Sequence, residues 1–281
     1  MAISGSMFRI ARLVMLGASL TTAALATSHA AVAAPCGNGP GGFNAWAADF
    51  KREAHSKGIS RKTIARAFKG VTYNRRIIRL DRSQRSFKQS FAKFYARRAS
   101  PWLLKKARSK LKRHARLFSA IEKRYGVPRE IIVTIWGMES NFGNGGGKMN
   151  IVRSLATLAY DCRRSAFFKK ELYSALKIIQ RGDMSPAQMR GGWAGEIGQT
   201  QFLATSYEKY AVDFDGNGRR NLIKSVPDVL ASTANFLKRK GWQRGQSWGP
   251  GSANFHVIKE WNRATVYQRT IAKAAAVLAQ K

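Results

Sequence analysis

The sequence predicts a mainly helical protein, and three features of the 281-residue chain support this fold class. Apolar residues recur three and four positions apart over long stretches, as at Phe43, Ala47 and Phe50, which is the spacing of one helix face. Helix-start signals precede such stretches, most clearly at 100–101, where a serine is followed by a proline. Breaks rich in glycine and proline, such as 245–252, separate the stretches.

The helical stretches follow one another along most of the chain. Spacing predicts helices over 42–58, 60–69, 102–125, 131–143, 151–159, 167–180 and 227–240, a helical face at Phe87, Phe91 and Phe94, and a C-terminal helix ending at 274–279. Residues 71–84 differ, because a turn at Tyr73 and Asn74 is followed by a short apolar run at Ile77 and Ile78 that fits an extended segment.

The first 34 residues have the composition of a secretory signal peptide. Two arginines precede an apolar run over 13–26, which is too short for a membrane span, and small residues follow. We therefore expect an exported, periplasmic protein whose folded part is 35–281. Pro35 precedes Cys36 where a lipoprotein signal requires a small residue, so a lipid anchor is not expected.

The chain is strongly basic, with a formal net charge of +35. Subtracting Arg9 and Arg12 of the leader leaves +33, which is enough to attract an anionic polymer or surface over a long range. Because the leader predicts export, we expect an anionic envelope surface as partner and no nucleic acid, since none of the standard nucleic-acid modules is present. The basic run within 102–125 meets no acid before Glu122, and is either a solvated face or a docking face for such a polymer.

Glu139 is the candidate catalytic residue. It follows Ile132, Ile135 and Trp136 by seven, four and three positions, so on a helix its carboxylate projects from the apolar face. Glycines from position 143 onward end the helix, and the chain can open into a cleft there. Removal from water raises the pKa of a carboxyl group, as a general acid near neutral pH requires. The alternative is an ordinary last-turn residue whose head group reaches solvent.

Cys36 and Cys162 are the only cysteines of the chain. An even number of cysteines in an exported protein predicts one disulfide, which would join the start of the mature chain to the segment after Glu139. The alternative is two free thiols.

Two glycine-rich segments have the composition of ligand-binding loops. Residues 144–148 do not match a phosphate-binding loop, because Phe142 stands where its first glycine belongs and Met149 where Ser or Thr should bind magnesium. This excludes nucleotide binding of that type. Residues 191–201 contain Gly195 and Gly198, which would let the backbone approach a ligand closely, and the alternative there is a plain linker.

An acidic loop at 213–219 reproduces the first half of an EF-hand calcium loop, with oxygen-bearing residues at positions 1, 3 and 5 and glycine at position 6. The twelfth position is Lys224 rather than glutamate, so Asp228 is the acid that would close the site. We expect a structural Ca²⁺ or Na⁺, against the alternative of an acidic turn that only orders the loop. The expected ligands are Asp213, Asp215, Asn217, Arg219 and Asp228.

Five motifs, in a fixed order, carry a family resemblance: WGMESNFG, LATLAYDCRR, GGWAGEIGQTQF, YAVDFDGNG and ANFLKRKGW. From about Phe43 to its C-terminus, the chain resembles the membrane-bound lytic transglycosylase B family of peptidoglycan lyases. This resemblance implies an α+β lysozyme-like fold, with a helical catalytic domain, a lysozyme-like core at about 115–245 and an EF-hand-like loop. It implies an enzyme that binds glycan strands and needs no cofactor for its chemistry, and we expect a monomer.

The resemblance also implies roles for single residues, with Glu139 as the catalytic acid and base. The residues that it implies as glycan contacts are Ser140, Arg163, Arg164, Phe167, Trp193, Gln201, Phe202, Phe236, Trp261 and Asn262. The chain departs from the family at 203–206, where Leu-Ala-Thr-Ser replaces Met-Pro-Ser-Ser, and at Phe167, where tyrosine is frequent. Hydrogen bonds to the sugars are therefore expected to differ in detail.

A single convincing acid fits a lyase better than a conventional glycosidase, which needs two carboxyl groups. Glu139 would protonate the bond between N-acetylmuramic acid and N-acetylglucosamine, while the acetamido group of the substrate stabilises the cationic transition state. Glu139 would then take the proton of the 6-hydroxyl as it closes on C1, which leaves a 1,6-anhydro end. Asp161, beside Cys162 and two arginines, is expected to be an ionised partner of those bases.

Two other functions are compatible with the sequence. A lysozyme-like hydrolase would use Glu139 with a second acid, Asp161 or Asp213, and would leave reducing ends. A non-catalytic envelope protein would bind the wall or another anionic polymer and would release no fragments.

Overall fold

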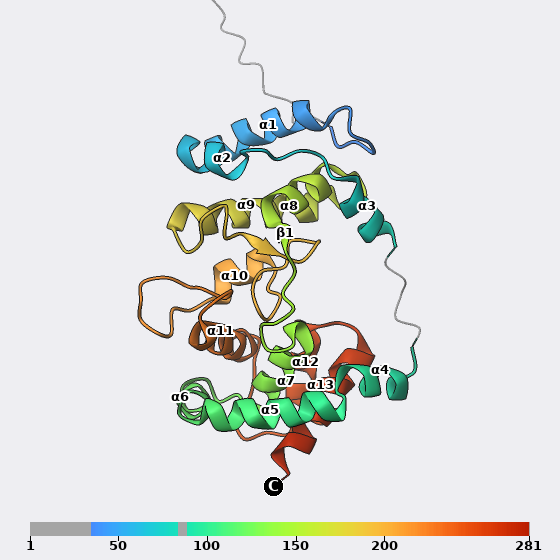
Figure 1. The fold of residues 1–281 in the computed structure, drawn as a ribbon, viewed down its shortest axis with the longest axis vertical. Coiled ribbons are helices and arrows are strands. Elements are labelled where there is room, and N and C mark those ends of the chain that lie inside the picture. The colour runs from blue at the N-terminus through green and yellow to red at the C-terminus, as the bar shows by residue number, and fades with distance from the viewer. Residues whose placement is uncertain (1–34, 84–88, 281) are drawn as a thin grey trace, which may run out of the picture. The chain divides into compact units, whose positions relative to one another are not determined.

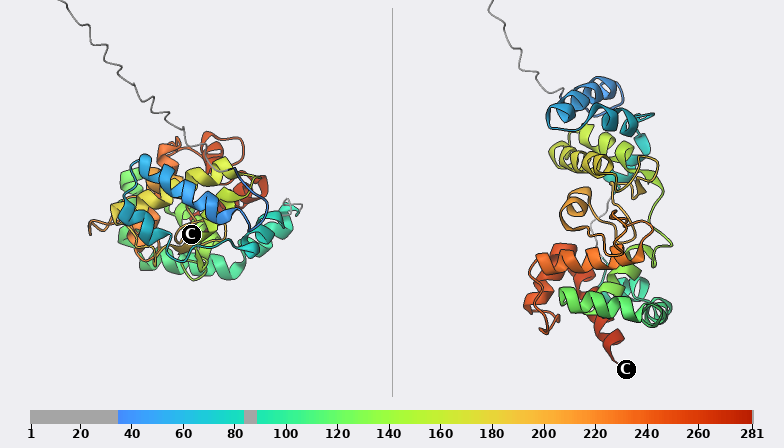
Figure 2. Two further views of the ribbon diagram at one scale, coloured as in Figure 1. Left: turned by 90° about the horizontal axis from the view of Figure 1, so that it is seen from above. Right: turned by 90° about the vertical axis from the view of Figure 1, so that its left-hand side faces the viewer.

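The computed structural model describes residues 35–83 and 89–280, and helices make up most of this part (Figure 1). The predicted signal peptide and Phe87 lie outside the described residues. The first helices are α1 (Phe43–Ser56) and α2 (Arg61–Ala67). They pack on α8 (Ile151–Tyr160) and α9 (Ser165–Arg181), as Figure 2 also shows. All four helices confirm the sequence prediction.

Helix α3 (Arg75–Arg82) contradicts the prediction of an extended run in this part of the chain. The side chain of Asn74 accepts a hydrogen bond from the backbone N–H of Arg76 (3.0 Å) and so caps the helix. Ile77 and Asp81, one turn apart, are both buried on the side that meets α8. A helix is therefore favoured because Asp81 has partners there, which the local pattern did not reveal.

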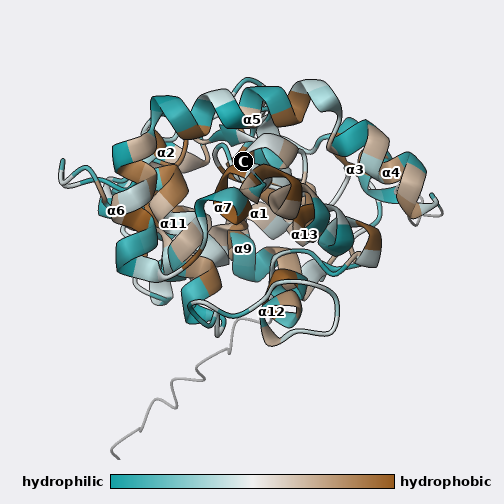
Figure 3. Cartoon of the chain, turned by 90° about the horizontal axis from the view of Figure 1, so that it is seen from below, coloured by the Kyte–Doolittle hydropathy of each residue, from teal (hydrophilic) through white to brown (hydrophobic). Residues whose placement is uncertain are grey.

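The basic stretch at 102–125 forms two helices, α5 (Pro101–Arg113) and α6 (Ala115–Tyr125), rather than the predicted single helix. The chain turns at His114, and this turn lets α5 pack on α7 while α6 packs on both α7 and α11. One straight helix could not bury both apolar faces against these neighbours. Seen in Figure 3, α5 carries hydrophilic residues along the outside of the molecule.

Helix α7 (Arg129–Ser140) lies among the helices of the lower part of Figure 1. Every residue from Ile131 to Met138 is buried, and helices α5, α6, α11 and α13 pack around it. The helix ends at Ser140, three residues before the predicted end, because Asn141 and Phe142 adopt left-handed backbone conformations (φ 52° and 58°).

The C-terminal part consists of α11 (Val226–Arg239), α12 (Ala253–Trp261) and α13 (Thr265–Ala279). Helix α11 confirms the prediction, but α12 and α13 replace the single predicted C-terminal helix. The break is stabilised at Asn262, whose side chain accepts from the backbone N–H of Ala264 (3.0 Å) and whose carbonyl accepts from Gln268 (3.0 Å). Helix α4 (Phe91–Arg98) packs on α13.

Short segments connect the helical layers. Strands β1 (Met149–Asn150) and β2 (Arg190–Gly191) pair antiparallel, and isolated bridges join Ile197 to Gly191 and to Phe202. Helix α10 (Ala204–Tyr210), which was not predicted, begins where the buried carboxylate of Glu171 accepts from the backbone N–H of Thr205 (2.9 Å).

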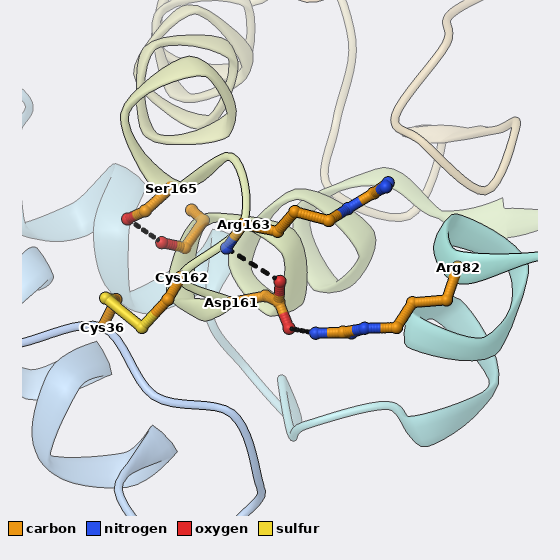
Figure 4. Close-up of a disulfide and its surroundings, with 7 residues drawn as sticks. Cys36, Arg82, Asp161, Cys162, Arg163 and Ser165 are labelled. Atoms are coloured by element: carbon orange, nitrogen blue, oxygen red, sulfur yellow. Dashed lines mark hydrogen bonds and ion pairs between the residues drawn. A yellow bond between two sulfur atoms is a disulfide. The ribbon is translucent and has the colours of Figure 1, made fainter. Parts of the chain in front are cut away.

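The predicted fold class and disulfide are confirmed. Cys36 and Cys162 are bonded, with their Cα atoms 5.0 Å apart, and the bond ties the start of the described chain to the segment after α8 (Figure 4). The helices from Phe43 to Ala279 belong to one compact unit. Within the described part, no helix has the length and apolar character that crossing a bilayer requires.

Candidate active site

Glu139 lies on the last turn of α7, where its carboxyl group receives two hydrogen bonds. The indole Nε1 of Trp261 donates to Oε1 over 3.0 Å, and the hydroxyl of Tyr267 donates to the same oxygen over 2.6 Å. The break between α12 and α13 brings both donors to this point, since one lies at the end of α12 and the other at the start of α13. Because both donors address Oε1, the proton of the neutral acid belongs on Oε2.

Burial raises the pKa of Glu139 above its ordinary value. The hydrogen bonds from Tyr267 and Trp261 and the positive charge of Arg98 act in the opposite direction, while the carboxylate of Glu196 raises the pKa further. The net effect is upward. A carboxyl group in this environment keeps its proton to a higher pH than an exposed one, as a general acid must.

Glu139 opens into a cavity of about 330 Å³. The cavity is lined by Glu139, Glu196, Gln201, Phe202, Leu203, Ser206, Phe236, Glu260, Trp261 and Asn262. The structure therefore brings five of the implied glycan contacts to the catalytic candidate: Gln201, Phe202, Phe236, Trp261 and Asn262. A larger hollow of about 550 Å³, between α4, α13 and residues 247–250, is lined by no acid among the described residues, so it cannot supply an acid catalyst.

An aromatic cluster holds Trp261 in place. The rings of Phe202 and Phe236 meet the Trp261 ring edge-on, with centroids 5.4 and 5.1 Å away, and they also contact each other at 6.0 Å. Edge-on aromatic contacts of this kind fix ring orientation. The indole N–H is consequently aimed at Glu139, and an apolar wall lines one side of the cavity.

The residues of WGMESNFG pack closely on one another at the end of α7. The Phe142 ring meets Trp136 edge-on (5.3 Å) and passes so close to Gly137 that a Cβ there would lie 2.7 Å from the ring. Nε1 of Trp136 donates to the side chain of Gln199 (2.7 Å), which in turn donates to the carbonyl of Ile223 (2.9 Å). These contacts fix the glycine-rich segment beside the end of α7.

Gln201 is held in a left-handed conformation (φ 53°), which is uncommon for a residue other than glycine. Its side-chain amide donates to the carbonyls of Gly198 (2.6 Å) and Gly146 (3.2 Å). The two glycine-rich segments therefore meet at Gln201. Glu196 and Gln201 of the segment 191–201 line the cavity and Gln201 is held by these hydrogen bonds, so the segment is not a plain linker.

Tyr267 and Glu196, which both act on the pKa of Glu139, were not predicted as functional. Tyr267 donates to Glu139 from 128 residues away, and a single aromatic residue on a helix face carries no signal that separates it from core. Glu196 lines the cavity and was visible in the sequence GEIG, inside a segment that was predicted to approach a ligand. An acid within such a segment is the signal that could have identified it.

The predicted glycan contacts Arg163 and Arg164 lie apart from the cavity-lining residues. Arg163 donates from Nε (2.9 Å) to the buried carboxylate of Asp81, and Arg164 donates to the other oxygen of the same group. Phe167 is 44% exposed and its ring meets Phe168 edge-on (5.0 Å). These residues belong to the region of α3, α8 and α9.

Ser140 and Trp193 are also absent from the cavity lining among the described residues. The Ser140 hydroxyl is buried and accepts from the backbone N–H of Gly143 (2.9 Å), which supports the end of α7. Trp193 is partly buried and packs against the hydrophobic core.

Asp161, considered as the second acid of a hydrolase, is buried beside the disulfide rather than in the cavity (Figure 4). It is an ion-pair partner, as expected, but its partner is Arg82 (2.7 Å) and not the side chains of the two following arginines. The backbone N–H of Arg163 donates to its other oxygen (3.1 Å). Asp213, the other acid considered, lies in the acidic loop.

The acidic loop brings carboxylate oxygens of Asp213, Asp215 and Asp228 within 4.8 Å of one another. Hard oxygen donors at this spacing suit Ca²⁺ or Na⁺. The same oxygens also order the loop, because backbone N–H groups of Phe214 and Asn221 donate to Asp228 (2.8 and 2.7 Å). The side chain of Asn217 accepts from the backbone N–H of Arg219. The residues present therefore fit a cation, with Asp228 as the buried member.

Comparison with known families identifies the chain. The family model described as the transglycosylase SLT domain matches residues 42–252. The chain belongs to this family. The matched region contains Glu139 and the cavity-lining residues up to Phe236, whereas Trp261 and Tyr267 lie beyond it.

Individual relatives of the transglycosylase domain agree with this membership. Membrane-bound lytic murein transglycosylase B of Escherichia coli (strain K12) is 43% identical over 122 residues, which are 43% of this chain and 34% of that protein's length. The crystal structure of SltB3 from Pseudomonas aeruginosa in complex with NAG-anhNAM-pentapeptide superposes on this chain with a TM-score of 0.80. The match covers 85% of this chain and 80% of the SltB3 chain, with 33% sequence identity. The Escherichia coli lytic transglycosylase Slt35 in complex with calcium shares the fold, with a TM-score of 0.74 and 24% sequence identity. That match covers 83% of this chain and 92% of the Slt35 chain.

Proposed function

We propose that this protein is a peptidoglycan lytic transglycosylase that cleaves the β-1,4 bond between N-acetylmuramic acid and N-acetylglucosamine. The observation that carries the proposal is the position of Glu139, a partly buried acid with a raised pKa that opens into a cavity with an aromatic wall. Membership of the transglycosylase family and the relative crystallised with NAG-anhNAM-pentapeptide support the same substrate class.

Glu139 performs both proton transfers of this reaction. Its Oε2 proton goes to the bridging oxygen, the bond from that oxygen to C1 of the muramoyl unit breaks, and the acetamido group of the substrate supports the cationic centre. The ionised Glu139 then takes the proton of the 6-hydroxyl, whose oxygen forms the new bond to C1. No water is consumed and the acid is regenerated. Tyr267 and Trp261 stabilise the ionised state between the two steps.

Substrate contacts are assigned according to position. Gln201, Phe202, Phe236, Trp261 and Asn262 line the cavity and are proposed to hold the sugars next to the cleaved bond. Remote contacts are proposed for Arg163, Arg164, Phe167, Trp193 and Ser140, which lie outside the cavity lining. Gln201, Phe202, Phe236 and Asn262 supply orientation rather than chemistry, whereas Trp261 also donates to Glu139.

A structural cation is proposed for the acidic loop. Asp213, Asp215, Asn217, Asp228 and the backbone of Arg219 would hold Ca²⁺ or Na⁺, and the ion would stabilise the loop between α10 and α11. The chemistry at Glu139 requires no cofactor in this proposal.

We also propose a periplasmic location for residues 35–281 as a monomeric catalytic domain, following export by the leader. The large positive charge would favour association with anionic envelope surfaces, because the long-range field attracts polyanions. Nucleic acid is not a proposed partner.

The proposal is tested by substituting the acid. Glu139→Gln keeps the shape of the side chain and can still accept hydrogen bonds on its oxygen, so we expect folding and binding to insoluble peptidoglycan to be retained. Release of soluble muropeptides should fall by about 10³-fold or more, since the proton donor is removed. Release at the parent rate would contradict the assignment of Glu139.

A hydrolase is the second candidate function, and one observation favours it. Glu196 is a second carboxyl group in the same cavity, and a conventional glycosidase uses a second carboxylate to activate water or to attack C1. In that case, the products would carry reducing ends that are heavier than the anhydro ends by one water molecule. The two mechanisms share Glu139 and differ in the product.

A further inference from the structure

Glu196 forms a carboxyl pair with Glu139 across the catalytic cavity. Both side chains line the same cavity, although one comes from the end of α7 and the other from the bridge segment between Gly191 and Phe202. Neither forms an ion pair with a Lys, Arg or His among the residues that the structure describes. Two carboxylates that share a partly buried cavity without a neutralising base repel each other when both are ionised.

The bridge segment between Gly191 and Phe202 holds the carboxyl group of Glu196 in position. Oε2 of Glu196 accepts from the backbone N–H of Ala194 (3.0 Å), and a Cβ added at Gly192 would lie 2.1 Å from that same oxygen. Gly195, in a left-handed conformation (φ 88°), packs so closely on Leu155 that a Cβ there would lie 2.3 Å from its side chain. The glycines beside Glu196 therefore hold its head group at the cavity rather than in solvent.

The other charged and titratable groups near the pair are few. Arg98 of α4 donates to the carbonyl of Met138, and its positive charge favours ionised Glu139. Tyr267 of α13 donates to Glu139. Glu260 of α12 also lines the cavity, but Lys240 pairs with it (2.8 Å) and offsets its negative charge. Glu196 is thus the carboxylate whose unpaired charge acts on Glu139.

We propose that Glu196 is a positioning residue for the proton of Glu139: its negative charge keeps Glu139 in the acid form that cleavage requires, and the pair holds one proton at working pH. Burial raises the pKa of both carboxyl groups, and the charge of Glu196 raises that of Glu139 further. This inference rests on the proposed function for its catalytic consequence, but not for the coupling itself.

The direction of the effect follows from the charge. Glu196→Gln removes a negative charge from the cavity while keeping the side-chain size. The pKa of Glu139 should then fall, because its ionised form is no longer opposed by a like charge. The high-pH limb of kcat/KM for peptidoglycan cleavage should move to lower pH.

Two further variants separate this effect from loss of structure. Glu196→Asp keeps the charge and should leave the limb close to the parent position, while Glu260→Gln removes a cavity-lining carboxylate whose charge Lys240 already offsets and should shift the limb much less. If Glu196→Gln moves the limb no further than Glu260→Gln does, the proposal is overturned. A shift in Glu196→Asp equal to that in Glu196→Gln overturns it as well.

A titration without substrate tests the coupling independently of activity. Side-chain carboxyl ¹³C resonances of the mature protein would be followed by NMR over pH, with the Glu139 signal identified by its loss in Glu139→Gln. We expect the Glu139 midpoint to fall in Glu196→Gln and to stay in Glu260→Gln. An unchanged midpoint in Glu196→Gln refutes the pair, even if the protein proves to cleave peptidoglycan. A shifted midpoint in a protein without lytic activity would support the pair and would contradict only the proposed function.

Discussion

The hydroxyl of Tyr267 donates to Oε1 of Glu139 over 2.6 Å, although 128 residues separate the two in the sequence. The bond crosses from the start of α13 to the end of α7, and both side chains are removed from water. Burial, and then the charge of Glu139 and the hydrogen bond to it, raise the pKa of Tyr267 well above its usual range, so the hydroxyl remains a donor throughout the physiological range. Tyr267 thereby fixes which oxygen of Glu139 carries the acidic proton.

Tyr267→Phe should shift the pH dependence upward, opposite to the change expected for Glu196→Gln. The lost hydrogen bond stabilised ionised Glu139, so its removal raises the pKa and moves the high-pH limb of kcat/KM to higher pH. We also expect a loss of about 10- to 100-fold in kcat, because one donor to the ionised intermediate state is gone. The measurement is a pH–rate profile on purified peptidoglycan. A limb that moves to lower pH would contradict this geometry.

Removal of Ca²⁺ by a chelator should lower the thermal stability of the protein if the acidic loop holds this ion. At a hundredfold excess over the dissociation constant, a bound ion adds about 2.7 kcal/mol to the free energy of unfolding, equivalent to a rise of about 5–10 °C in Tm. Asp213→Asn should abolish this rise, while Asp49→Asn, an acid elsewhere that pairs with Arg52, should not. Thermal unfolding is measured with EDTA and with added Ca²⁺, Mg²⁺ or Na⁺. The same Tm in all these solutions would leave the loop as an ordering turn.

Asp81→Asn should destabilise the region that carries the predicted glycan contacts Arg163 and Arg164. Asp81 is buried and accepts from both arginines, which are themselves about 40% exposed. Because the arginines can turn to solvent, we expect a loss of about 2–3 kcal/mol rather than the full cost of a buried unpaired charge. Urea denaturation measures the loss. An effect no larger than that of Asp49→Asn would show that the ion pairs contribute little.

The disulfide should contribute strongly to stability, since it closes a loop between positions separated by 126 residues. The double variant Cys36→Ser, Cys162→Ser should lose about 2–5 kcal/mol in the free energy of unfolding. Reductant should lower the stability of the parent protein to a similar degree and should leave the double variant unchanged. Equal stability of parent and variant would contradict the expectation. Activity at low temperature should survive, because the bond lies away from the catalytic cavity.

Local sequence patterns predicted most helices correctly. They failed where packing between distant segments determines whether a helix forms or where it breaks. Spacing placed α1, α2, α8, α9 and α11 because apolar residues recur at helical intervals within each of them. It could not predict the breaks at His114 and Asn262, since each depends on which neighbours the two halves meet. Helix α3 was missed because its buried acid, Asp81, meets its partners Arg163 and Arg164, in the segment between α8 and α9, only in the folded chain.

The sequence predicted part of the candidate site. Helical spacing pointed to Glu139, the family resemblance implied the glycan contacts, and the structure places five of those contacts in the cavity with Glu139. Tyr267 could not be found, because nothing local distinguishes it from a core aromatic residue. Arg163 and Arg164 were expected at the glycan, but the structure pairs them with Asp81, and their contact with substrate stays a prediction.

The most direct test of the central claim is the mass of the glycan ends that the purified protein releases from peptidoglycan sacculi. If Glu139 serves as the only acid and base, all released muramoyl ends should be 1,6-anhydro, and Glu139→Gln should release none. Products with reducing ends, heavier by one water molecule, would show that a second carboxylate such as Glu196 activates water and that the single-acid account is wrong.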